Sequence, residues 1–239
     1  MMLLLCVLCL SGCGAGDEEK KNIYEVYHIS NTETKVVLHE HEMKATTPEE
    51  MLNELLTCLA TTPEKLEYME SGRQFQCRLL HNNGLYLHAS AVEKDGKAYL
   101  FSAPSGTGKS THTRLWRQVF GSRAVMVNDD KPFLKLTEAG IFACGSPWSG
   151  KHGLDTNMTV PLQGICILER GKENRIERIS VSEALPMLLH QSYCPLDPKK
   201  RVCFENLVKQ LAEKTPLWRM YCNMDPAAAE VSHSAMSQI

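Results

Sequence analysis

Small, hydroxyl-bearing and basic residues follow one another near the middle of this 239-residue chain, in the stretch FSAPSGTGKSTHTRLW. Glycines let a backbone curl so that successive N–H groups face one anion, and a helix that begins there adds positive potential. A lysine can then reach the terminal phosphates of a nucleotide such as ATP, and the next hydroxyl can ligate Mg²⁺. We therefore predict a nucleotide-binding loop formed by Ser105, Gly106, Thr107, Gly108, Lys109, Ser110 and Thr111.

The residues around this loop predict a strand before it and a helix after it, which is the arrangement that a phosphate-binding loop requires. The apolar stretch AYLFS predicts a strand before the loop, and Ser110–Phe120 predicts a helix that Gly121 ends. The loop departs from the usual pattern at its first position, where Ala103 replaces a glycine. A β-carbon is tolerated there if the φ angle of Ala103 is negative.

Two adjacent carboxylates, Asp129 and Asp130, end the apolar stretch AVMV, about twenty residues after the loop. Neighbouring side chains at a strand end point in different directions, so one carboxylate can face a metal and the other an incoming hydroxyl. His88 ends another apolar stretch, LYL, and could lie beside the pair. The alternatives are an Asn-Asp turn that caps the strand and a structural histidine.

The overall composition is that of a globular protein without a nucleic-acid partner. The hydrophobic share is 43%, the charged share is 23% and the formal net charge is −2. No basic run is longer than Lys199–Arg201, so no phosphate-backbone footprint is predicted. The cysteines after the first 21 residues are scattered and include no CxxC pair, which indicates reduced thiols and a reducing compartment.

The first residues resemble the leader of a bacterial lipoprotein. The apolar run Met1–Leu10 is too short to span a bilayer, and the LSGC that follows would make Cys13 a lipidated membrane anchor. No Lys or Arg precedes the run, which departs from a usual leader. The alternatives are a buried N-terminal strand and a truncated start.

A small ββα segment is predicted between the leader and the loop. It consists of the strand-like IYEVYH, a hairpin partner at Lys35–His39 and the helix EEMLNELLTCLA, which Thr47 and Pro48 introduce. This segment resembles the start of the small domain of spore-germination and sporulation lipoproteins. We therefore expect a leader and tether over residues 1–21, the ββα segment over 22–63 and an ATP-binding domain over 64–239.

The rest of the chain predicts an α/β fold. Asp95 and Gly96 are expected to form a hairpin turn between the strand-like stretches GLYLHASAV and KAYLFSA. Two further strands are expected at GICILER and LWRMYCN, and three helices at VSEALPMLLHQS, FENLVKQLAEKTP and DPAAAEVSHSAM. Pro186 is predicted to bend or end the first of these helices.

Several of these stretches together resemble a known family. LHASAV, KAYLFSAPSGTGKSTHTRLW, VNDDKP, CGSPWSGKHGL and VPLQGICILERG are similar to the C-terminal kinase domain of HPr kinase/phosphorylase. They are more similar to the shorter HPr-kinase-like proteins encoded near peptide-modification genes. The resemblance covers about residues 66–239. It implies a phosphoenolpyruvate-carboxykinase-like P-loop domain with a mixed sheet, ATP and Mg²⁺ as cofactors, and association of copies into a ring-shaped homo-oligomer.

The resemblance also implies a role for each matching residue. Asp129 would be the general base for a substrate serine hydroxyl, Asp130 would support the metal or orient the nucleotide, and His88 takes the place of the family's active-site histidine. As in the loop described above, Lys109 would contact the terminal phosphates and Ser110 would ligate Mg²⁺. The stretch GSPWSGK contains no acid, which argues against a phosphorylase activity and favours a simple kinase.

The leading hypothesis is therefore an ATP- and Mg²⁺-dependent kinase that acts on a serine of a peptide or small protein. The alternatives are a kinase of free serine or another small alcohol, and a membrane-anchored lipoprotein with a non-catalytic nucleotide-binding fold. Phosphoenolpyruvate carboxykinase chemistry is disfavoured because the chain is too short for that enzyme's substrate domain. A kinase domain is expected in the cytoplasm, whereas a genuine leader would make the chain a membrane lipoprotein. A fusion of a lipoprotein start with a kinase that lost its first strands would explain this conflict.

Overall fold

The computed structural model describes residues 62–195 and 197–238. The leader, the predicted lipidation at Cys13 and all but the last two residues of the expected ββα segment lie outside this range. The chain divides into two units after Ser71, within the helix α2 (Pro63–Leu79). The sheet, the remaining helices and the predicted site all belong to the second unit.

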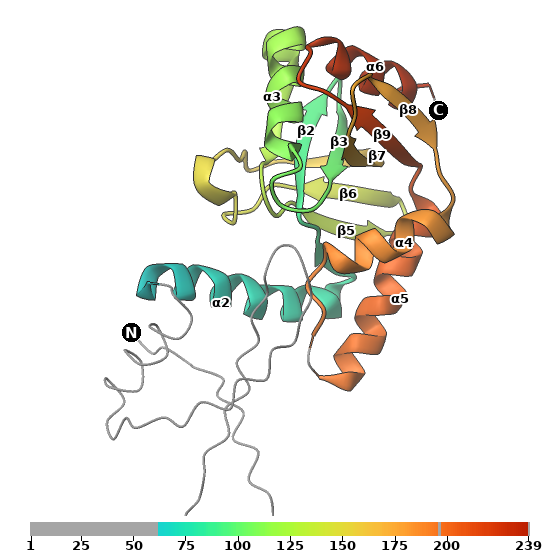
Figure 1. Ribbon diagram of the computed structural model, residues 1–239. Coiled ribbons are helices and arrows are strands. Elements are labelled where there is room, and N and C mark those ends of the chain that lie inside the picture. The colour runs from blue at the N-terminus through green and yellow to red at the C-terminus, as the bar shows by residue number, and fades with distance from the viewer. Residues whose placement is uncertain (1–61, 196, 239) are drawn as a thin grey trace, which may run out of the picture. The chain divides into compact units, whose positions relative to one another are not determined.

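The second unit is built on a mixed sheet of nine strands (Figure 1). The strands are β1 (Gly84–Tyr86), β2 (Ala89–Lys94), β3 (Lys97–Ser102), β4 (Ala124–Asn128), β5 (Phe133–Thr137), β6 (Gly140–Cys144), β7 (Thr159–Arg170), β8 (Arg175–Arg178) and β9 (Leu217–Cys222). The central part has the order β4-β2-β3-β7-β9-β8. Within it β7 runs parallel to both β3 and β9, and the other pairs are antiparallel. The start of β7 also pairs with β6 and so joins an antiparallel arm of order β1-β5-β6.

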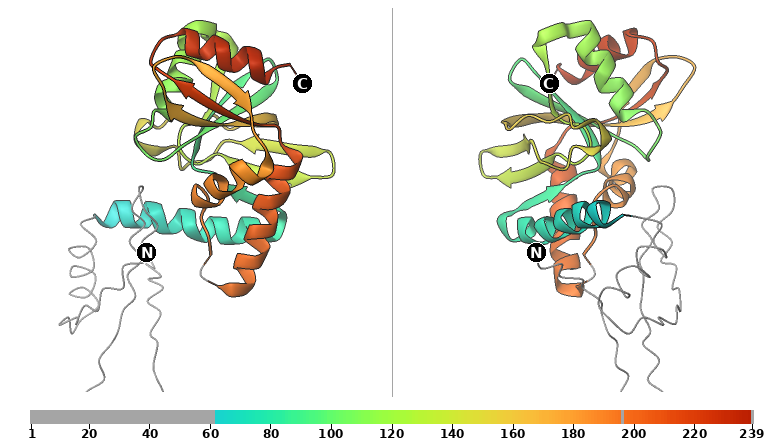
Figure 2. Two further views of the ribbon diagram at one scale, coloured as in Figure 1. Left: turned by 45° about the vertical axis from the view of Figure 1, so that its right-hand side comes forward. Right: turned by 90° about the vertical axis from the view of Figure 1, so that its left-hand side faces the viewer.

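Helices cover both faces of the central strands. They are α3 (Lys109–Phe120), α4 (Val181–His190), α5 (Pro198–Lys214) and α6 (Ala227–Met236), with short 3₁₀ turns at Leu80–Asn82, Gly121–Arg123 and Gly150–His152. One core lies under α3 and α6, and a second core lies under α4 and α5. The further views show the green α3 and red α6 on the opposite side of the sheet from the orange α4 and α5 (Figure 2). No helix in the described part of the chain is long and apolar enough to cross a bilayer.

The two cores explain why the central strands have apolar residues at consecutive positions in the sequence. Successive side chains of a strand point to opposite faces, so a strand covered on both faces needs apolar residues at every position. On β3, Leu100 belongs to the core under α4 and α5, whereas Phe101 belongs to the core under α3 and α6. Ile167 and Cys166 of β7 divide in the same way.

The expected strands and helices of this unit are found, with two differences. GLYLHASAV forms two strands, because β1 pairs with β5 whereas β2 pairs with β3 and β4. The break between them falls at Leu87 and His88, so His88 lies in the connection directly after the LYL stretch that it was expected to end. Pro186 was predicted to bend or end its helix, and it lies inside α4, so the second alternative, an end of the helix, is wrong. A proline this close to a helix start removes one intrahelical hydrogen bond, and the helix continues on its buried face through Ala184 and Leu188.

The hairpin turn expected at Asp95 and Gly96 is confirmed. It joins β2 to the antiparallel β3, with φ angles of +54° at Asp95 and +79° at Gly96. Two consecutive positive φ angles are typical of the two-residue turns that match the twist of paired strands. This turn fixes the register of the strand that leads into the glycine-rich loop.

Candidate active site

The glycine-rich loop joins the end of β3 to the start of α3, as the sequence predicts. Its backbone is left-handed at Gly106, where φ is +79°, and at Gly108, where φ is +125°. A residue with a β-carbon rarely adopts such angles, which explains the two glycines. Among the described non-glycine residues, φ is positive at Asn83 and Asp95 alone. Ala103 therefore meets the condition that its position sets.

The predicted binding residues of the loop differ in their exposure. Ser105 and Gly106 are exposed, whereas Thr107 and Gly108 are half-buried. Ser110 and Thr111, in the first turn of α3, are also half-buried. The tip of the loop is therefore open to a ligand, and its helical end is partly enclosed.

Lys109 folds back over this loop. Its side chain is buried, and Nζ donates a hydrogen bond of 2.8 Å to the carbonyl oxygen of Ala103. Burial lowers the pKa of Lys109 to about 8, while the charges of Asp130 and Asp129 act to raise it. The lysine and both carboxylates therefore share one electrostatic site, although they come from different elements.

Asp129 is the more enclosed of the two carboxylates, with 6% of its surface exposed. Its Oδ1 accepts a hydrogen bond of 2.7 Å from Ser90 Oγ on β2. The same hydroxyl lies 2.7 Å from Thr113 Oγ1 on α3. These contacts fix the carboxylate between the sheet and the helix that follows the loop.

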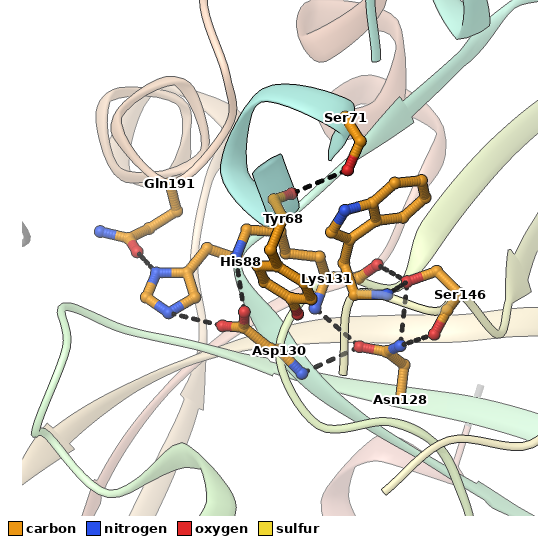
Figure 3. A network of polar contacts seen from close by, with 9 residues as sticks. Tyr68, Ser71, His88, Asn128, Asp130, Lys131, Ser146 and Gln191 are labelled. Atoms are coloured by element: carbon orange, nitrogen blue, oxygen red, sulfur yellow. Dashed lines mark hydrogen bonds and ion pairs between the residues drawn. The ribbon is translucent and has the colours of Figure 1, made fainter. Parts of the chain in front are cut away.

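Asp130 points the other way, as expected for neighbouring residues at a strand end. Its Oδ1 lies 3.4 Å from His88 Nε2, and its Oδ2 pairs with Lys131 Nζ. Figure 3 shows the carboxylate between these partners. The Asp130 side chain is 21% exposed, so it is more accessible to a ligand than Asp129.

His88 is held by Gln191, which follows the last turn of α4. Gln191 Oε1 lies 2.7 Å from His88 Nδ1 (Figure 3). The backbone N–H of His88 also donates to the Gln191 carbonyl at 2.8 Å. A carbonyl oxygen only accepts, so Nδ1 carries the proton and Nε2 faces Asp130. Burial lowers the pKa of His88 to about 4; Lys109 and Lys131 lower it too, while Asp130 and the Gln191 hydrogen bond raise it. The imidazole is therefore neutral at pH 7.

The lowered pKa of His88 predicts that the protein becomes less stable in acid, which can be measured. We expect the free energy of unfolding to fall as the pH drops from about 6.5 to about 4, because the unfolded chain then binds a proton that folded His88 does not. Burial also lowers the pKa values of His112 and His233, so a difference measurement is needed. Urea unfolding of wild type and His88→Asn at about pH 7 and about pH 4.5 provides it. The wild type should lose more stability than the variant, and equal losses would contradict the burial of a neutral His88.

Asn128 and Ser146 support the acidic pair, and sequence reasoning missed these supporting roles. Asn128 is completely buried, and its amide donates to Ser146 O and Oγ at 2.8 and 3.0 Å. Its Oδ1 accepts from the backbone N–H groups of Asp130 and Lys131 at 2.9 and 2.6 Å (Figure 3). The turn considered as an alternative to a site is thus present, and it orients Asp130. An asparagine that directly precedes two acids was the available signal.

The donors at the loop fit Mg²⁺ only together with a phosphate. The described residues contain no group of three or more His, Cys, Asp or Glu side chains that could hold a metal ion. Ser110 and Asp130 offer a hydroxyl and a carboxylate, which are too few for an all-protein cage. Mg²⁺ at nucleotide sites is bound through one or two such groups, waters and phosphate oxygens. The residues present match that arrangement.

Known proteins resemble this chain in different degrees. The HPr(Ser) kinase/phosphatase from Coxiella burnetii is similar in structure over 54% of this chain and 97% of its own, with a TM-score of 0.29 and 16% sequence identity. No curated protein sequence matches the chain. The family model of the SynChlorMet cassette protein ScmC matches residues 59–225, which contain the loop, both carboxylates, His88 and Gln191. Because that match covers more than half of the chain and the whole of this site, the protein belongs to the ScmC family.

Proposed function

We propose that this protein transfers the terminal phosphoryl group of ATP, in the presence of Mg²⁺, to a serine hydroxyl of a peptide or small protein. One observation carries the proposal. Lys109 is buried against a loop in which Gly106 and Gly108 have positive φ angles. The negative charges of Asp129 and Asp130 act to raise the pKa of this lysine. A phosphate cradle beside carboxylates is what phosphoryl transfer requires, because its catalysis is mostly positioning and charge neutralisation.

The loop would hold the nucleotide by its phosphates. The backbone N–H groups at the start of α3, which lack partners within the helix, would supply donors, and Lys109 would supply a positive charge. Ser110 and Asp130 would hold Mg²⁺ together with phosphate oxygens. The metal would neutralise charge on the phosphates. We include in the proposal the phosphoenolpyruvate-carboxykinase-like fold, which the mixed sheet and the strand–loop–helix unit support.

Asp129 would act as the general base. In the proposed step the serine oxygen attacks the γ-phosphorus and its proton passes to Asp129. The bond from that phosphorus to the β–γ bridging oxygen breaks, and ADP leaves. The hydrogen bond from Ser90 orients the carboxylate through Oδ1. Among the described residues Oδ2 has no hydrogen-bond partner, which leaves it for the substrate hydroxyl.

His88 would act beside this step rather than in it. Its proton on Nδ1 is committed to Gln191, so Nε2 can only accept while the ring is neutral. Asp130 lies on that side of the ring. A neutral Nε2 donates nothing to Asp130, so the hydrogen bond from Lys131 Nζ to Oδ2 would orient this carboxylate toward the metal and the phosphates, and His88 would border the site as an acceptor.

Transfer to defined acceptors tests the proposal. The full chain is incubated with Mg²⁺, ATP labelled in its γ-phosphate and a set of serine-containing peptides, and labelled peptide and ADP are measured. Matched peptides with alanine in place of serine, and free serine, are the controls. We expect label on serine peptides alone. Label on free serine instead would make the protein a small-molecule kinase, and ADP formation no higher than without protein would contradict the proposal.

A further inference from the structure

Arg170 lies beside the glycine-rich loop, although it follows that loop by more than sixty residues. It is the last residue of β7, which runs parallel to β3 and pairs Ile167 with Ser102 at the end of that strand. β7 therefore continues for three residues beyond the point where β3 gives way to the loop. In sheets with parallel strands, ligands bind outside the carboxyl ends of the strands, and Arg170 is at that edge.

The guanidinium of Arg170 contacts the loop directly. Its Nη2 donates a hydrogen bond of 2.7 Å to the carbonyl oxygen of Gly106. The neighbouring Glu169 pairs with Arg219 instead. Among the described residues no carboxylate forms an ion pair with Arg170. Its one hydrogen bond within this part of the chain is therefore to the loop.

This contact determines how one peptide unit of the loop is turned. The Gly106 carbonyl and the Thr107 N–H belong to the same planar trans peptide, so they point in opposite directions. With the carbonyl held toward Arg170, the Thr107 N–H faces across the loop and donates to the Pro104 carbonyl at 3.2 Å. Gly106 has no β-carbon to restrict its backbone, so the two hydrogen bonds of this peptide unit, one to Pro104 and one from Arg170, select its orientation.

We propose that Arg170 is a positioning residue for the nucleotide, because it fixes the Gly106–Thr107 peptide and, through it, the turn at the tip of the loop in which the Thr107 N–H donates to the Pro104 carbonyl. The inference rests on the proposed function for the identity of the ligand, a nucleoside triphosphate bound by its phosphates. The loop would otherwise have to be ordered when the nucleotide binds, and that cost would weaken binding. Arg170 acts through Gly106, so it should affect affinity for MgATP and leave the transfer step unchanged.

Two substitutions and one control test this role. Arg170→Gln removes the charge, Arg170→Lys keeps a charged donor without the planar guanidinium, and Arg175→Gln removes an exposed arginine of β8 that pairs with Glu177. The dissociation constant of MgATP is measured by calorimetry. The hydrogen exchange of a peptide covering residues 103–110 is measured without nucleotide. The KM for ATP and kcat are measured by phosphoryl transfer.

We expect Arg170→Gln to raise the dissociation constant and KM about tenfold, as the loss of one charge-assisted hydrogen bond would. Its kcat and melting temperature should stay at the wild-type values, and exchange in the loop should be faster. Arg170→Lys should recover part of the affinity. Arg175→Gln should behave as wild type.

The outcomes separate this inference from the proposed function. If the wild type binds MgATP and Arg170→Gln binds it equally tightly, with unchanged loop exchange, the inference is overturned and the proposed function stands. Equal weakening in Arg175→Gln would show a general effect of charge and would also overturn it. If the wild type binds no MgATP, the proposed function itself fails, and the inference fails with it.

Discussion

Replacing Asp129 by asparagine is expected to lower the rate of phosphoryl transfer by about 10²- to 10⁴-fold, the usual contribution of a general base. Asparagine has nearly the same shape, and its amide oxygen can still accept the hydrogen bond from Ser90 Oγ. It cannot take a proton from the attacking hydroxyl. The substitution should therefore lower kcat, while the dissociation constant of MgATP changes little.

The matched control for Asp129→Asn is Glu138→Gln. Glu138 is an exposed acid in the turn between β5 and β6, so its substitution removes the same charge away from the loop. Both variants are compared with wild type by labelled transfer to a serine peptide and by MgATP calorimetry. Glu138→Gln should retain the wild-type rate. A wild-type rate in Asp129→Asn would disprove the role of this aspartate as the base.

Replacing Lys109 by methionine is expected to weaken MgATP binding by at least about 10²-fold, since it removes the buried charge that would face the phosphates in the proposed complex. Methionine keeps the length of the apolar stem. It also removes a charge whose burial lowers the pKa to about 8. Holding that charge in the fold costs stability at neutral pH, so Lys109→Met should be at least as stable as wild type.

Calorimetry with MgATP and urea unfolding separate these two effects. Lys97→Met is the control, because Lys97 is an exposed lysine at the start of the same strand, β3. It should bind MgATP as the wild type does. If Lys109→Met and Lys97→Met bind with equal affinity, Lys109 does not contact the phosphates. Weaker binding together with a large loss of stability would instead assign Lys109 a structural role.

The local elements around the loop could be predicted from the sequence because their signals are local. AYLFS is apolar at consecutive positions, and the helix was expected at 110–120 and is found at Lys109–Phe120. The glycines mark the loop between them, and Gly121, with a positive φ of 59°, ends the helix. Each of these signals depends on neighbours a few residues away. The sequence pattern therefore contains most of what is needed to find them.

The supports of the site could not be predicted in the same way, because they come from distant parts of the chain. Gln191 lies 103 residues after the histidine that it holds, and Arg170 lies 64 residues after Gly106. Sheet topology brings them together. β1 comes directly before β2 in the sequence, but it pairs with β5 instead of continuing into β2. β7 pairs with β3 and extends past the end of that strand. Neither pairing has a local signature in the sequence.

The decisive measurement is the transfer of labelled γ-phosphate from MgATP to a serine peptide by wild type, Asp129→Asn and Lys109→Met. MgATP binding by the same three proteins is measured in parallel. The three proteins are expected to give three different results. The wild type binds and transfers, Asp129→Asn binds without transferring, and Lys109→Met does neither. Equal transfer by all three proteins, or no MgATP binding by the wild type, would contradict the claim that this loop and its carboxylates form a phosphoryl-transfer site.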